Sequence, residues 1–116
     1  MIARALAAEL GLRVTERRRG GVAPYRCVIS ELHARSKTIV LYRDALDLLG
    51  TLIDAKSLPF DRAQLEEIAI AHECFHARSS RGSEESAHAF AASLLGLAES
   101  PALLDEALAR HLAGVA

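Results

Sequence analysis

The sequence predicts an α+β fold: an N-terminal helix, a small antiparallel β-sheet of two to three strands, and a mainly helical C-terminal part. Up to Tyr42, the apolar residues come in short runs that are bounded by Gly, Pro and other turn residues, which is typical of strands. From Arg43 onward, apolar residues recur every three or four positions, as they do in amphipathic helices. The chain has 116 residues and no internal repeat, so residues 1–116 are predicted to form a single domain.

The first half of the chain is predicted to contain one helix and three strands. Residues 2–10 form an apolar helical segment that ends at a glycine. Residues 12–18 alternate in character, as a half-buried strand does. Two further segments, residues 25–33 and 38–42, are rich in β-branched and aromatic residues and flank a short turn. These two are predicted to pair as a hairpin, with residues 12–18 as the third strand.

The second half of the chain is predicted to contain four helices, each with a recognisable start or stop signal. The first ends before a proline, the second has an Asp N-cap with Gln in the capping-box position, and the third has a Ser N-cap. The fourth begins with Pro in its preferred first helical position. Their ranges are Arg43 to the residue before Pro59, 62–79, 84–98, and a helix that starts at Ser100-Pro101.

Composition and charge narrow the classes of partner. The chain is 51% hydrophobic and 25% charged, which is ordinary for a globular protein. A net charge of -1 predicts no direct nucleic-acid binding. No apolar run approaches the length of a membrane span, and the N-terminal segment lacks the features of a signal peptide. Cys27 and Cys74 form no C-x-x-C pair, so no disulfide framework is indicated and a cytoplasmic location is expected.

The segment His72-Glu73-Cys74-Phe75-His76 carries the clearest chemical signal. Two histidines four residues apart lie on one face of a helix, about 6 Å apart along its axis, and can bind one metal ion from the same side. Glu73 points about 100° away from His72, which suits a base acting on water at that metal better than a third ligand. This is the H-E-x-x-H arrangement of zinc peptidases, so we predict Zn²⁺ at His72 and His76, with Glu73 as the general base.

A catalytic zinc site needs a third protein ligand, and the next predicted helix offers three candidates. Glu84, Glu85 and His88 all lie in its first turns. Because the connection between the two helices is short, the helices should run antiparallel as neighbours. Glu84 is then level with His76, and His88 is level with His72. The spacing alone leaves all three candidates open.

Residues 84–95, which read Glu-Glu-Ser-Ala-His-Ala-Phe-Ala-Ala-Ser-Leu-Leu, resemble the second motif of the ImmA/IrrE family of zinc metallopeptidases. That family pairs H-E-x-x-H with a downstream E-x-x-A-[ND]-x-F-A-x-x-L-L. The resemblance implies a gluzincin-type zinc site in which His72, His76 and Glu84 are the metal ligands and Glu73 is the general base. It also implies a regulatory protease that acts on a protein or peptide partner, such as a helix-turn-helix repressor.

The chain departs from the family pattern at four points. His88 stands where the family has Asn or Asp, Phe75 where it has Gly, and Gly96 where it has Pro. The gap between the second histidine and the glutamate, residues 77–83, is also short. These departures bear on activity more than on metal binding. They motivate an alternative function, a non-catalytic zinc-binding interaction module of the same fold.

Two further readings of the polar residues remain as alternatives. Glu73-x-x-His76 and Glu85-x-x-His88 are both E-x-x-H motifs, which helical bundles use to build di-iron carboxylate sites. His33 and Tyr42 lie on or at the end of the predicted hairpin strands, where either side chain would be a candidate for stabilising an oxyanion.

Overall fold

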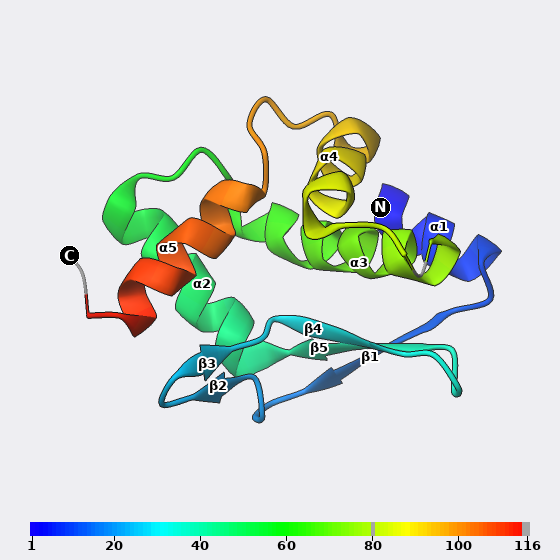
Figure 1. Ribbon diagram of the computed structural model, residues 1–116, viewed down its shortest axis with the longest axis horizontal. Coiled ribbons are helices and arrows are strands. Elements are labelled where there is room, and N and C mark those ends of the chain that lie inside the picture. Colours follow the sequence, from blue (N-terminus) through cyan, green and yellow to red (C-terminus); the bar gives the residue numbers. More distant parts are fainter. Residues whose placement is uncertain (80, 115–116) are drawn as a thin grey trace.

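The computed structural model describes residues 1–79 and 81–114, and it confirms the predicted α+β class (Figure 1). An N-terminal helix precedes the strands, and four helices follow them. The elements of the described residues are α1 (Ile2–Glu9), β1 (Arg13–Arg17), β2 (Val22–Ala23), β3 (Arg26–Cys27), β4 (Ser30–His33), β5 (Thr38–Tyr42), α2 (Arg43–Lys56), α3 (Arg62–Arg78), α4 (Glu84–Leu95) and α5 (Ala102–Leu112).

The main sheet has the strand order β1-β5-β4 and is mixed. β4 and β5 form the predicted antiparallel hairpin. The expectation of an entirely antiparallel sheet is wrong, because β1 pairs with β5 in parallel. All five residues of β5 are buried, and the central position of a sheet is the one that covers both edges of a strand. The most apolar strand therefore takes the centre, and β1 lies on its far side from β4.

The predicted single strand over residues 25–33 is divided in the structure. Its first part, β3, pairs with β2 in a separate two-stranded ribbon, and only its second part joins the main sheet as β4. The Asp44 carboxylate accepts hydrogen bonds from the backbone N–H groups of Gly21 and Val22, at 3.2 and 3.1 Å. This contact holds the start of the ribbon against α2. It joins residues that are more than twenty positions apart, so local patterning does not reveal it.

Helix α3 lies at the centre of the molecule, between the sheet and α4 (Figure 1). The run Ile68, Ala69, Ile70 and Ala71 is at most 4% exposed, as expected of a helix that is covered on several sides. α1 and α2 pack beside it. Within the described part of the chain, every helix is too short or too polar to span a bilayer.

The ends of the helices follow local capping signals. At the start of α3, the Gln64 side chain accepts a hydrogen bond from the Asp61 backbone N–H at 2.9 Å, which is the predicted capping box. Helix α4 ends at Leu95 rather than at Ala98. Gly96 adopts a left-handed conformation with φ +66° and closes the helix three residues earlier than predicted, because glycine takes this conformation without steric cost.

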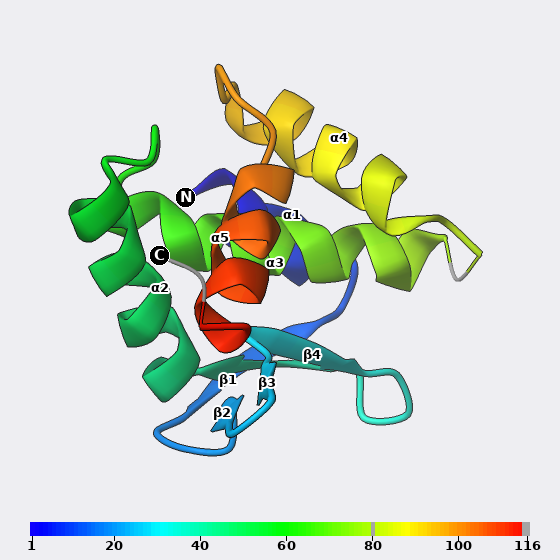
Figure 2. The ribbon, with the colours of Figure 1, turned by 60° about the vertical axis from the view of Figure 1, so that its left-hand side comes forward.

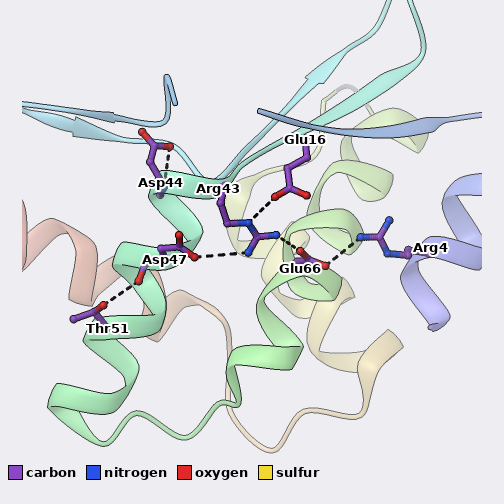
Figure 3. A network of polar contacts seen from close by, with 8 residues as sticks. Arg4, Glu16, Arg43, Asp44, Asp47, Thr51 and Glu66 are labelled. Atoms are coloured by element: carbon purple, nitrogen blue, oxygen red, sulfur yellow. Dashed lines mark hydrogen bonds and ion pairs between the residues drawn. The ribbon is translucent and has the colours of Figure 1, made fainter. Parts of the chain in front are cut away.

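A network of ion pairs joins four elements, α1, β1, α2 and α3 (Figure 3). Arg43, the first residue of α2, pairs with Glu66 of α3 and with Glu16 of β1, the latter at 2.6 Å. The other carboxylate oxygen of Glu66 accepts from Arg4 of α1 at 3.1 Å. The hydrogen bond from Arg43, followed by that from Arg4, holds the pKa of Glu66 below its ordinary value, although partial burial opposes this.

We expect this network to make stability dependent on pH in acid. Because the pKa of Glu66 is lower in the folded state, its contribution is present above the ordinary value of 4.5 and is lost as pH falls through the folded-state pKa. Glu66→Gln should cost about 1–2 kcal/mol at neutral pH, allowing for its partial exposure. Urea unfolding at several pH values measures this. A variant that loses no stability at pH 7, or whose loss of stability does not shrink as the pH falls below 4.5, contradicts the role assigned to Glu66.

Candidate metal centre

The turn between α3 and α4 brings the start of α4 back over the C-terminal part of α3. A Cβ atom at Gly82 would lie 2.2 Å from Cε2 of Phe75, so only glycine allows the backbone to pass this close to the ring. Ser83 then caps α4, and its hydroxyl oxygen accepts from the Ser86 backbone N–H at 3.1 Å. Glu84 is the first residue of the helix and faces α3. Phe75 is thus accommodated by a glycine on the opposing turn.

Three side chains converge between the two helices. Glu84 Oε1 lies 2.8 Å from His76 Nε2, Glu84 Oε2 lies 3.0 Å from His72 Nε2, and the two Nε2 atoms are 3.1 Å apart. Tetrahedral zinc with bonds of about 2.0 Å separates its ligand atoms by about 3.3 Å. The structure thus brings His72, His76 and Glu84 together, and their donor atoms suit one zinc ion; their role as ligands remains a prediction.

The other two candidates for the third ligand differ in position. Glu85 is exposed. Among the described residues, potential metal ligands form two groups, one of His72, His76 and Glu84 and one of Glu84, His88 and Asp105, and Glu85 belongs to neither. The two E-x-x-H motifs therefore do not converge on one site, which counts against a di-iron centre. His88 is 9% exposed, and its ring centroid lies 5.4 Å from that of His72, as the predicted helix hairpin requires. Its Nε2 lies 2.8 Å from Oδ2 of Asp105 in α5.

Glu73 is buried next to these side chains and accepts a hydrogen bond from a residue of the sheet. Only 7% of its surface is exposed, and its Oε2 accepts a hydrogen bond from the Ser30 hydroxyl at 2.7 Å. Ser30 is the first residue of β4 and is itself 8% exposed. Sequence reasoning missed both Ser30 and Asp105. Neither lies in a motif, and each meets its partner only through the tertiary fold.

A cavity of about 170 Å³ opens beside these residues. His72, Glu73, Glu84, His88 and Asp105 provide its polar wall. The apolar wall comes from the segment before β4, from α3 and α4, and from Pro101 and α5, which crosses α3 in Figure 2. The described residues that line the cavity include no Lys or Arg, so three carboxylates face it without a permanently charged basic side chain.

Cys74 and the hairpin residues His33 and Tyr42 do not line this cavity. Burial, aided by the Glu73 and Glu67 carboxylates, raises the pKa of Cys74 to about 11, so its thiol stays protonated at neutral pH. The Tyr42 hydroxyl donates a hydrogen bond to the Glu31 carboxylate, and His33 Nε2 lies 3.7 Å from Oε1 of the same carboxylate. Neither His33 nor Tyr42 lines the cavity, so the oxyanion role considered for them is not supported.

The chain matches no protein-family profile, no curated protein and no solved structure. The functional interpretation of the centre is therefore based on its residues and their geometry.

Proposed function

We propose that the protein is a zinc-dependent metallopeptidase that hydrolyses a peptide bond. The observation that carries this proposal is the convergence of His72, His76 and Glu84 within hydrogen-bonding distance of one another, beside a cavity that Glu73 also lines. Two imidazoles and one carboxylate form the ligand set of many catalytic zinc sites, which keep a further position for water or substrate. A buried carboxylate at the same cavity supplies the base that such chemistry needs.

Each residue has a distinct task in this proposal. His72 and His76 would hold zinc through their Nε2 atoms, and Glu84 would hold it through its carboxylate. Bound zinc supplies Lewis acidity, which polarises the scissile carbonyl and makes water more acidic at neutral pH. Glu73 accepts the proton of the attacking water and transfers it to the leaving amine. The hydrogen bond from Ser30 fixes one oxygen of Glu73 and leaves the other, Oε1, for this proton.

The sheet supports an extended peptide as the substrate. The strand order places β4 at an edge, and Ser30 at its start lines the cavity. An edge strand has unpaired backbone groups that can pair with an added peptide strand. The resemblance to the ImmA/IrrE family adds a regulatory protein as the partner, such as a helix-turn-helix repressor.

A second candidate function is a non-catalytic zinc-binding interaction module. The departures from the ImmA/IrrE pattern at Phe75, His88 and Gly96 favour this alternative, because they bear on activity more than on metal binding. In that case the metal ligands would still bind zinc, and β4 would still bind a partner, but no bond would be broken.

Cleavage of a peptide library separates the two functions. Zinc-loaded protein should produce new peptide termini that mass spectrometry identifies, and a chelator should stop their formation until zinc is restored. The same products from Glu73→Gln protein would point to a contaminating protease. If zinc-loaded protein cleaves no peptide above the background of this variant, the peptidase proposal fails and the interaction module is favoured.

A further inference from the structure

We propose that the centre binds two divalent metal ions and that Glu84 bridges them. His72 and His76 would complete the first ion's protein ligands, and His88 and Asp105 those of the second. The inference deepens the proposed function and rests on it, since both ions share Glu84. The second ion belongs to the class that imidazole and carboxylate ligands bind together, such as Zn²⁺ or Mn²⁺.

The geometry provides a second group of potential ligands beside the first. Donor atoms of Glu84, His88 and Asp105 lie within 4.8 Å of one another, as do those of Glu84, His72 and His76. Glu84 is common to both groups and has two oxygens, so one carboxylate is available to two ions. In enzymes with two metal ions, the ions lie about 3.5–4 Å apart, which is the separation a bridging carboxylate produces.

The charge of the cavity also favours a second cation. Glu73, Glu84 and Asp105 all line it, and no Lys or Arg does so among the described residues. With neutral imidazoles, the three carboxylates exceed the charge of one divalent ion. These like charges repel one another, although solvent screens the largely exposed Glu84 and Asp105, and a cation offsets the repulsion. A second ion on Asp105 and His88 would provide that charge.

The first turn of α5 places Asp105 at the cavity. Pro101, Leu104 and Leu108 lie on the same stripe of the segment at spacings of three and four residues, and all of them line the cavity with Asp105. Pro101 is almost completely buried, which places the start of α5 against the rest of the site. Asp105 follows Leu104 directly and is largely exposed, yet it lines the cavity as well. His88, 9% exposed, faces it from α4 at 2.8 Å.

Native mass spectrometry of the full chain during a zinc titration tests the inference. Wild-type protein should bind two zinc ions. Asp105→Asn should bind one, because an amide is a much weaker zinc ligand than a carboxylate. The Asp105 side chain is 61% exposed, so this change should leave the fold intact. Glu85→Gln removes an exposed carboxylate from the same region and should still bind two ions.

A second variant keeps the result interpretable. His72→Ala should also bind one ion, held by Glu84, His88 and Asp105. Wild-type protein that stops at one ion in excess zinc, or Asp105→Asn protein that still binds two, overturns the inference. One ion that is lost in His72→Ala but kept in Asp105→Asn would leave the first zinc site standing. Failure of the peptidase proposal shows separately, as the absence of cleavage by protein with its metal bound.

Discussion

Replacing Glu73 with glutamine is expected to lower the rate of peptide cleavage by about 10²–10⁴-fold, the usual contribution of a general base. Glutamine keeps the size of the side chain, and its carbonyl oxygen can still accept the hydrogen bond from Ser30. It cannot accept a proton at neutral pH. The fold and the zinc content should therefore be unchanged, so the loss should appear in kcat and not in metal binding. Steady-state kinetics on a peptide identified from the library, with zinc analysis of the same sample, measures both quantities.

Ser30→Ala tests whether the base is positioned from β4. It removes the hydroxyl that donates to Glu73 Oε2 at 2.7 Å and leaves the carboxylate in place. We expect a smaller loss of cleavage than for Glu73→Gln, because the base is retained but less well oriented. Glu85→Gln, on an exposed side chain outside the ligand groups, serves as the control and should retain full activity. Cleavage by Glu73→Gln at the wild-type rate would exclude the proposed mechanism.

Replacing Glu84 with alanine is expected to weaken zinc binding by more than about 100-fold, since changes even to residues behind the ligands cost 10–100-fold. Glu84 is the residue whose two oxygens contact both Nε2 atoms of the histidine pair, at 2.8 and 3.0 Å. Its removal leaves only two imidazoles facing the first ion. Competition with a chromogenic chelator measures the affinity.

Glu85→Ala is the matched control for this change. Glu84 and Glu85 are adjacent acids in the first turn of α4, both are exposed, and both interact favourably with the helix dipole. Only Glu84 lies among the potential ligands. If both variants lower zinc affinity equally, the effect is one of charge near the helix N-terminus and Glu84 is not a ligand. If only Glu84→Ala does so, Glu84 rather than Glu85 is the ligand.

The helices, and the helix face on which the two histidines lie, could be predicted from the sequence because they depend on residues that are close together along the chain. The H-E-x-x-H spacing puts His72 and His76 on one helical turn in any helix that contains it. The capping box at Asp61 sets where that helix starts. The connection to the next helix is short and contains Gly82, which restricts the arrangement to an antiparallel pair. For this reason the closeness of Glu84 to His76 was predictable, whereas its contact with His72 was not, because the spacing had placed His88 level with His72.

Other parts of the site depend on contacts between distant segments. Ser30 reaches Glu73 across 43 positions, and Asp105 reaches His88 across 17 positions and a change of direction after α4. No local period encodes these contacts, because they are decided by how β4 and α5 pack on α3. The parallel pairing of β1 with β5 has the same origin. It places the most apolar strand, β5, at the buried centre of the sheet, whereas an antiparallel meander in chain order would leave β5 at an edge.

The sequence by itself determined the α+β class, the helix that carries the two histidines and the base, and the neighbouring helix that offers a third ligand. The tertiary structure alone decided which acid faces the histidines, what holds the base, and which residues close the cavity. Local geometry is set by spacing and capping within a few residues. The side chains of the site come from four segments, and the packing of those segments in the folded chain decides which side chains meet.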